Sequence, residues 1–541
     1  MVKVINKLLS RTGFAFLFML IGCTAFAQGD YFPYRLEIKA VDVTGFPGLH
    51  SFAYGQLSGK WVLIGGRRDG LHARQPNSSF PSASNNTEIF LISIEDRKLL
   101  KVGLDQLETP IREQLQSTNM QFVQEGEYLY VIGGYAFSPT KGDHVTFPYL
   151  TVIHLPGLIG AIESGSSIQP YFRQLEDERF AVTGGQLAKL DGVFFLVGGH
   201  RFDGRYNPVG NPTFTQSYTN QIRKFRLASP SEELAILSYE AITDPVHLRR
   251  RDYNLIPQIF PDGSQGYTIS SGVFQLGVDL PYLYPVDISA TGYQPITAFN
   301  QYLSNYHSAK GSLYDSENKQ MHTLFFGGIS QYYYKDGDLV KDDLVPFVKT
   351  ISRLTRSKEG VFHEYLIPLE MPGLVGAGSE FIPNEKLPHI HAEVVDLNKV
   401  KEEDFLLGYV VGGIQSPSLN PFASNQTSTT SADKKIYEVK LKFDTITSIY
   451  PVDGGNPYDV LVYPNPGNGD IFIRYQIDAL TDTRFFITNS LGQIVSEGSF
   501  ENQVLGNNER SVSISPDLSG QVLLLTVIFG DKYYVTKRVI R

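Results

Sequence analysis

The chain has 541 residues, of which 42% are hydrophobic and 19% charged, and its formal net charge is −9 at pH 7. These proportions are those of a soluble globular protein, and the length allows two or more domains. The acidic balance, without a basic stretch, argues against nucleic acid as a partner. Tyrosine (31) and phenylalanine (35) favour strands, and 50 glycines with 30 prolines supply turns, so an all-β chain is predicted.

The first predicted element is a signal peptide over residues 1–27. Three basic residues precede the short apolar run Gly13–Gly22, and the small-residue site Ala25–Ala27 follows it. The run is shorter than the roughly 20 residues that span a bilayer, and no later stretch qualifies, so we expect no transmembrane segment. Cys23 ends a run that also resembles a bacterial lipoprotein site, but we expect cleavage after Ala27 instead. The mature chain would then contain no cysteine, which excludes disulfides and thiol catalysis.

Six segments repeat one pattern, an apolar strand that ends in a glycine pair or its remnant. They are Trp61–Gly66, Tyr128–Gly134, Phe194–Gly199, Tyr267–Gly272, Thr323–Gly328 and Gly408–Gly413. Such an ending requires a backbone that crowds its neighbours or turns with positive φ, which glycine adopts without a Cβ penalty. Another strand precedes each strand that ends in a glycine pair, and two more strands follow the pair. Six units of four short antiparallel strands predict a β-propeller over residues 28–455, with six blades favoured over seven, and a β-solenoid is the alternative fold.

The repeats resemble the kelch motif, in which a strand ending in Gly-Gly precedes a third strand that carries an aromatic residue. The resemblance covers residues 45–450 and implies a kelch-like propeller. The tryptophan usual late in a kelch repeat is absent, since Trp61 lies before a glycine pair, and Ser271 replaces the first glycine of the fourth pair. The stretch Tyr34–Val43 precedes the first full unit, and we expect it to close the ring by pairing with the last blade.

After residue 455 the periodicity changes. Several short alternating strands in residues 456–541 predict a small, immunoglobulin-like β-sandwich. Four motifs follow one another there: Tyr463–Pro466, Leu491–Val495, Leu518–Gly520 and a basic tail from Lys537 to Arg541. This segment resembles the C-terminal sorting domain of type IX secretion cargo, of the kind made by Bacteroidetes. The resemblance implies contact with the type IX machinery, export to the cell surface or the medium, and no catalytic task. An unrelated accessory domain is the alternative.

Common catalytic motifs are missing from the chain, including Gly-x-Ser-x-Gly, His-Glu-x-x-His and a Walker-type loop. A copper-radical oxidase of the galactose oxidase type needs a Cys–Tyr crosslink, which a cysteine-free mature chain cannot form. The acidic loop Asp336–Asp343 lacks the full pattern of a calcium loop. His389, His391 and Glu393 would share one strand face, as a metal site requires, but a strand-start histidine more commonly bonds a carbonyl. We therefore predict no metal and no cofactor.

Alignment of the six units on their glycine pairs indicates a candidate site. The start of the first strand then falls near His50, Thr118, Thr183, Arg250, His307 and His391. In a propeller this strand lines the central channel, and its start lies on the face that carries the long loops after the glycine pairs. Ligand pockets of closed β folds lie at such a mouth. The candidate ligand-binding residues are His50, Arg67, Arg68, His200, Arg201, Arg250, His307 and His391.

Two functions from different classes fit this pattern. Long polar loops on a rigid scaffold, without a catalytic set, favour a secreted or cell-surface module that binds an extracellular glycan or protein. The alternative is a sugar-modifying propeller enzyme, such as a sialic-acid-type epimerase or mutarotase, in which arginine holds a carboxylated sugar and histidine moves a proton. Clustered histidines and arginines favour an anionic ligand such as an acidic sugar. A water-filled channel whose polar residues only satisfy each other is the remaining possibility.

Overall fold

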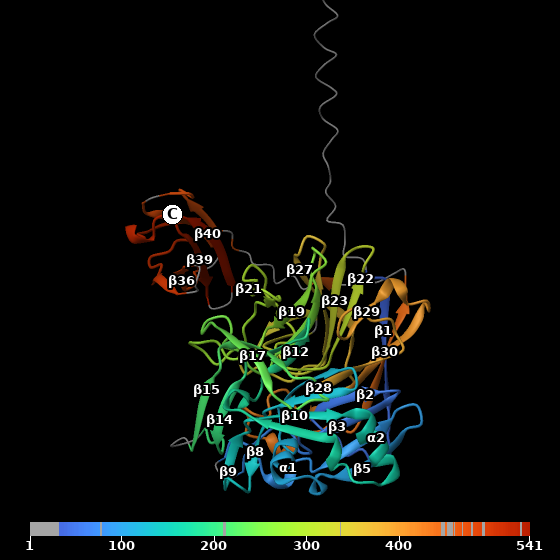
Figure 1. Ribbon diagram of the computed structural model, residues 1–541. Coiled ribbons are helices and arrows are strands. Elements are labelled where there is room, and N and C mark those ends of the chain that lie inside the picture. Colours follow the sequence, from blue (N-terminus) through green and yellow to red (C-terminus); the bar gives the residue numbers. More distant parts are fainter. Residues whose placement is uncertain are drawn as a thin grey trace, which may run out of the picture.

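The computed structural model describes residues 32–541 except 76–77, 209–212, 336, 445–449, 452–457, 459, 468, 478–479, 490–492 and 531–532 (Figure 1). The predicted signal peptide, its Cys23 and the predicted junction at residues 455–456 lie outside the described residues. The described part is all-β, as predicted, with two short α-helices, α1 (Thr109–Leu115) and α2 (Leu155–Ser164). None of its helices combines the length and the apolar character that a membrane crossing requires.

Six sheets of the described part share one design of four antiparallel strands, which in five of the sheets are hydrogen-bonded in chain order. The first sheet contains β2 (Ala53–Leu57), β3 (Lys60–Ile64), β4 (Glu88–Ser93) and β5 (Lys98–Gly103). The second contains β6 (Gln121–Glu125), β7 (Tyr128–Ile132), β10 (Tyr149–His154) and β11 (Phe172–Glu176). The third contains β12 (Gln186–Leu190), β13 (Val193–Val197), β16 (Gln221–Leu227) and β17 (Ile236–Thr243). The fourth contains β18 (Asn254–Ile259), β19 (Gln265–Ser270), β20 (Val286–Ile288) and β21 (Tyr293–Pro295). The fifth contains β22 (Lys310–Asp315), β23 (Gln320–Phe326), β26 (Thr350–Arg356) and β27 (Phe362–Glu370). The fifth sheet is extended at its two edges by β29 (Val394–Asp396) and β33 (Tyr450–Pro451).

The sixth sheet takes its outer strand from the other end of the repeat region. Its own strands are β28 (Leu374–Pro383), β30 (Asp404–Ser416) and β32 (Ile436–Phe443), with the short β31 (Ser431–Ala432) beside β30. The fourth is β1 (Tyr34–Val41), antiparallel to β32, with Tyr34 opposite Phe443 and Val41 opposite Ile436. This pairing confirms that the N-terminal segment fastens onto the last unit.

The glycine pairs link each unit to the next. In every unit the amide of the second glycine donates a hydrogen bond to a carbonyl that lies just before the first strand of the following unit or, for Val375, at the start of that strand. These bonds join Gly66 to Ser117 (2.8 Å), Gly134 to Val182 (2.9 Å), Gly199 to Arg250 (2.7 Å), Gly272 to Asn305 (3.0 Å), Gly328 to Val375 (2.8 Å) and Gly413 to Leu49 (2.8 Å). Because the sixth bond returns to the first unit, the six sheets are joined in a closed ring.

The crowding that the sequence predicted at these pairs is severe. At Gly133 φ is +65°, and a Cβ atom there would lie 1.9 Å from the carbonyl oxygen of Val182 in the next unit. In the fourth unit Ser271 stands in place of the first glycine, also with positive φ, and its hydroxyl donates to the carbonyl of Tyr282 (2.6 Å). Serine is therefore accommodated at this position, where the other units have glycine, because its hydroxyl forms a hydrogen bond within its own unit.

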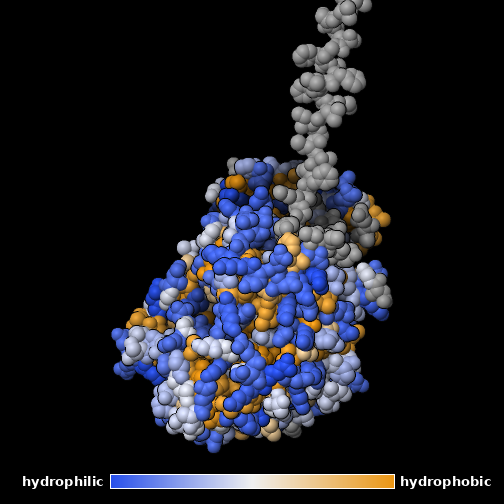
Figure 2. All heavy atoms as spheres, turned by 90° about the vertical axis from the view of Figure 1, so that its right-hand side faces the viewer, coloured by the Kyte–Doolittle hydropathy of each residue, from blue (hydrophilic) through white to orange (hydrophobic). Residues whose placement is uncertain are grey.

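The apolar core of the six-sheet body is divided among the contacts between neighbouring sheets. Residues that share a buried cluster across two sheets include Val62 and Leu129, Ile132 and Leu196, Val197 and Ile269, Ile256 and Phe325, Leu324 and Val410, and Leu63 and Val411. Each sheet is therefore covered by its two neighbours. On the outside, hydrophobic side chains are interspersed with hydrophilic ones on the face that carries β1 (Figure 2).

The C-terminal region forms two further sheets around one core (Figure 1). One contains β34 (Val460–Tyr463), β35 (Ile471–Ile477) and β38 (Gly506–Val512), and the other β37 (Ile494–Ser499), β36 (Thr483–Thr488), β39 (Val522–Phe529) and β40 (Tyr533–Ile540). Ile473 of β35 and Leu525 of β39 belong to the buried cluster between them. Tyr534 contacts the fourth unit, where its hydroxyl donates to Oε1 of Gln275 (3.1 Å).

Candidate functional site

A cavity of about 540 Å³ lies where the six units meet. Each unit contributes one residue, here called its entrance position, from just before its first strand or, in the sixth unit, from the start of that strand: His50, Thr118, Thr183, Arg251, Tyr306 and Ala377. The loops after the glycine pairs complete the wall. Among them are the hairpins β8 (Tyr135–Ser138) with β9 (Asp143–Thr146), β14 (His200–Gly204) with β15 (Phe214–Tyr218), and β24 (Tyr332–Lys335) with β25 (Asp338–Lys341).

A ring of backbone hydrogen bonds forms the floor of this cavity. In each unit the residue after the entrance position bonds to its counterpart in the neighbouring unit. The donor and acceptor pairs are Ser51 and Gly378 (2.7 Å), Asn119 and Ser51 (3.1 Å), Gly184 and Asn119 (3.2 Å), Asp252 and Gly184 (2.7 Å), His307 and Asp252 (2.9 Å), and Gly378 and His307 (3.0 Å). Beyond the ring, residues further along the first strands, such as Phe52 and Glu380, line a void of only about 10 Å³.

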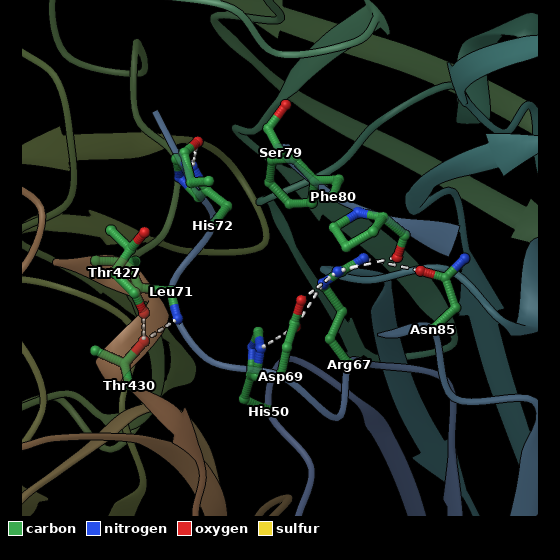
Figure 3. Close-up of polar contacts among 12 residues, drawn as sticks. His50, Arg67, Asp69, Leu71, His72, Ser79, Phe80, Asn85, Thr427 and Thr430 are labelled. Carbon is green, nitrogen blue, oxygen red and sulfur yellow. Dashed lines mark hydrogen bonds and ion pairs between the residues drawn. The ribbon is translucent and has the colours of Figure 1, made fainter. Parts of the chain in front are cut away.

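Arg67 lies in the cavity wall, and its charge is balanced within the protein (Figure 3). It is 2% exposed, and its Nε donates to Oδ1 of Asp69 (2.9 Å) while Nη1 donates to Oδ1 of Asn85 (2.8 Å). Burial raises the pKa of Asp69, but its contacts with His50 and Arg67 outweigh burial and hold that pKa well below its ordinary value. Asp69 is therefore ionised and neutralises Arg67.

Arg251 is the second arginine of the wall and was missed by the sequence alignment. It pairs with Asp252, its Nε donates to the hydroxyl of Tyr218 (3.2 Å), and its guanidinium lies 5.0 Å from the ring centroid of Phe274. The sequence contains one signal that could have identified Arg251 as the residue that faces the cavity, because most entrance positions are followed by a residue type that tolerates positive φ. In five of the six units the residue after the entrance position has positive φ, and most of these five belong to types that tolerate it: Ser51, Asn119, Gly184, Asp252 and Gly378.

Two histidines of the cavity, His72 and His200, are held neutral by burial. His72 stacks on Phe80, with ring centroids 4.8 Å apart, and lies edge-on to Tyr206 (4.8 Å) and Phe422 (5.5 Å). Burial lowers the pKa of His72 to about 4. Burial also places the pKa of His200 well below its ordinary value, and the Arg251 charge adds to this. At pH 7 neither imidazole carries a charge.

Four of the eight candidate residues lie in the wall: His50, Arg67, His200 and His307. Two others lie elsewhere and are paired at the surface of their own loops. Arg68 donates to Asn86 (2.7 Å) and pairs with Glu88 (2.6 Å). Arg201 is half exposed and pairs with acidic neighbours of its own loop and the one before. Neither contributes to the cavity.

Arg250 and His391 were predicted to line the cavity, but neither of them does. Arg250 is fully buried behind the wall, between the rings of Tyr282 (4.3 Å) and Tyr284 (4.6 Å), because the strand entrance is displaced by one residue and Arg251 takes the expected place. His391 lies in the segment between β28 and β30, since β28 is the first strand of the sixth unit. Its ring packs 5.4 Å from that of Tyr267.

The floor carries an acid–base pair of its own. Nε2 of His307 lies 3.1 Å from Oε1 of Glu380. Nearby, the hydroxyl of Tyr54 donates to Glu393 (2.5 Å), whose pKa is raised by burial. No group of three or more histidine, cysteine, aspartate or glutamate side chains among the described residues is arranged to hold a metal ion.

Residues 461–541 match the family model described as "Secretion system C-terminal sorting domain". The C-terminal region is a type IX sorting domain. This confirms that part of the resemblance, implies interaction with the type IX secretion machinery, and identifies the protein as secreted or held at the cell surface.

The rest of the chain has only distant likenesses. No curated protein matches it. Among solved structures, "Structure of YjhT" aligns with a TM-score of 0.40 and 10% identity over 74% of this chain and 99% of that one. A fungal alcohol oxidase of the AA5 family, in complex with copper, aligns with a TM-score of 0.35 and 10% identity over 94% and 100% of the two chains. Both TM-scores are too low to support an argument.

Proposed function

We propose that the protein is an exported, six-bladed kelch-type β-propeller that binds a glycan in its central cavity. In this proposal residues 1–27 are removed, residues 28–455 form the propeller and residues 456–541 direct export. The closed ring of bonds between six four-stranded sheets supports the fold. The sorting domain supports a place of action outside the cell.

The observation that carries the binding proposal is the cavity itself. Its volume of about 540 Å³ falls in the range of roughly 300–1,000 Å³ typical of ligand pockets. Its aromatic lining consists of Phe80, Tyr135, Phe202, Tyr206, Phe274, Tyr306, Phe347 and Phe422. Flat apolar faces of this kind pack against the C–H faces of sugar rings, and interspersed polar groups bond hydroxyls. A deep recess at the centre of the loops favours a glycan over the flat surface of a folded protein.

The charges of the wall favour a neutral sugar over the acidic one expected from the sequence. Arg67 is neutralised by Asp69 and Arg251 by Asp252. His72 and His200 are uncharged at pH 7, and Asp279 also lines the cavity. A carboxylated ligand would have to compete with protein carboxylates that already occupy both guanidinium groups.

A glycan array tests this proposal. The chain from residue 28 to 541 is expected to bind neutral glycans, and Arg251→Ala to weaken that binding by at least about tenfold, equivalent to about 1.4 kcal/mol. Arg201→Ala is the matched control, because this arginine lies outside the cavity. Unchanged binding by Arg251→Ala, or binding to proteins but to no glycan, would contradict the proposal.

The enzyme alternative rests on the pair formed by His307 and Glu380 in the floor, 3.1 Å apart. An imidazole positioned by a carboxylate can move a proton at a sugar carbon or at the ring oxygen. Interconversion of sugar anomers or epimers, followed by NMR, would be lost in His307→Gln if this pair were catalytic. The binding proposal expects no interconversion by the wild type.

A further inference from the structure

We infer that the cavity receives the terminal unit of a glycan chain and excludes internal units; this rests on the binding function proposed above. The first reason is the closed floor. The wall ends at the ring of six backbone hydrogen bonds, and the void beyond it has a volume of about 10 Å³, roughly that of one water. A chain cannot pass through the channel and leave at the other side.

The second reason is the order of the residues that lead into the first strands. His50 lines only the large cavity, Ser51 lines both spaces and Phe52 lines only the small one. The same sequence of layers is found from Thr118 through Asn119 to Met120. The floor is therefore one residue layer thick in separate units. It is held by backbone groups, which a ligand cannot displace without breaking the ring.

Side chains also narrow the lower space. His307 and Glu380, whose Nε2 and Oε1 atoms lie 3.1 Å apart, both line it, and so does the buried Phe52. Removal of one polar partner would leave the other buried and unpaired. The large cavity is thus a recess with a single opening, on the side of the loops.

The third reason is the nature of the rim. Leu344 and Leu419 line the mouth, although 62% and 39% of their surfaces are exposed. Leu276 and Val278, on either side of Gly277 in the loop that carries the lining Asp279, are 69% and 40% exposed. These side chains come from three different units. They provide apolar contacts for the second and third sugars of a chain whose terminal sugar occupies the recess.

Calorimetric titration tests end recognition with linear manno-, xylo-, cello- and N-acetylchito-oligosaccharides of one to six units, and with soluble mannan and xylan. The full mature chain is expected to bind one oligosaccharide of the preferred series, with affinity that rises to two or three units and then stays constant. The number of proteins bound per polysaccharide chain should not exceed its number of ends. A stoichiometry that increases with chain length would overturn end recognition and leave the binding function standing.

Two variants separate the recess from the rim. Leu344→Ser with Leu419→Ser is expected to weaken hexasaccharide binding by about three- to tenfold without changing monosaccharide binding. Arg251→Ala should weaken both equally. Both leucines are partly or largely exposed, so their replacement leaves the core intact. An equal loss for both sugars in the leucine variant would overturn the role of the rim. Absence of binding to every series, or no effect of Arg251→Ala, would overturn the proposed function itself.

Discussion

The six-sheet body and the C-terminal sorting domain are both built from short antiparallel strands, but they are stabilised differently. In the body every sheet depends on its two neighbours, both for apolar contacts and for the bonds at the glycine pairs. In the sorting domain a single cluster between two sheets supplies the core. Damage to one unit should therefore affect the whole ring, whereas damage to the tail should stay in the tail.

The glycines show the same difference. Gly133 and Gly412 of the body are pressed against carbonyl oxygens of the next unit, which a Cβ would approach to 1.9 Å and 2.2 Å. Gly506 and Gly520 of the tail also have positive φ, but a Cβ there would have no atom within 4 Å. These two body glycines are required by assembly of the ring, and these tail glycines only by the local turn.

The largest effect is expected when the C-terminal sorting domain is removed from the six-sheet body. Deletion of residues 456–541 should leave a folded body, because the ring closes through β1 and β32 without the tail. Surface delivery should be lost, since the sorting domain is removed. Proteolysis of intact cells and fractionation would locate the truncated chain in the periplasm. Normal delivery of the truncated chain to the surface would contradict this.

The next prediction breaks the ring at one glycine. Gly133→Ala should destabilise the body by more than about 4 kcal/mol, because its Cβ meets the Val182 carbonyl. Gly126→Ala is the matched control, with similar positive φ but no atom within 4 Å, and should cost about 1 kcal/mol. Scanning calorimetry should show loss of the body transition alone. Equal costs for the two variants would show that crowding at the glycine pair is unimportant.

A third prediction confines damage to the tail. Leu525 is fully buried in the tail core, so Leu525→Ala should cost about 2–5 kcal/mol and lower only the tail transition. Its neighbour Leu524 points to the other face and is 42% exposed, so Leu524→Ala should change stability by less than about 0.5 kcal/mol. A simultaneous drop of the body transition in Leu525→Ala would show that the two regions are coupled.

The last prediction concerns pH; the change per pH unit should be smaller than the effects above, and it should occur in the body only. Glu364 is buried, accepts hydrogen bonds from the amides of Tyr302 (2.8 Å) and Leu303 (3.0 Å), and has its pKa raised from 4.5 to about 8 by burial. Because the folded state holds this proton more tightly than the unfolded state, its stabilising contribution is complete below pH 4.5 and declines as pH rises toward 8.

The decline should be at most about 1.4 kcal/mol per pH unit. Glu364→Gln should remove this slope from the free energy of unfolding, measured by urea denaturation between pH 4.5 and 8. Glu359→Gln, at an exposed position, should keep it. An unchanged slope in Glu364→Gln would show that this carboxyl does not titrate in the window.

The elements that the sequence predicted best are those with a local steric cause. Each strand ending in Gly-Gly was placed correctly because positive φ and close backbone contact can be met by few residue types, and these appear in the sequence itself. The pairing of Tyr34–Val41 with the last unit followed from the same repeat pattern. The sorting domain was recognised from motifs within one contiguous segment.

The site was predicted less well because it depends on single-residue displacement and on charge pairing. In an extended strand neighbouring side chains face opposite ways, so a shift of one residue exchanged Arg251, which faces the cavity, for the buried Arg250. The insertion after β28 similarly displaced the alignment to His391. The arginines were counted as free cations, whereas Asp69 and Asp252 neutralise those that reach the wall.

The sequence by itself therefore determined the all-β repeat, its glycine junctions, its N-terminal closing strand and its sorting tail. Only the tertiary structure decided which side chains share the cavity, how its charges cancel and where its floor lies. The reason is physical. The backbone conformation and crowding at a glycine junction restrict the residue type at that single position, whereas the shape of the cavity depends on how loops from six separate units pack together.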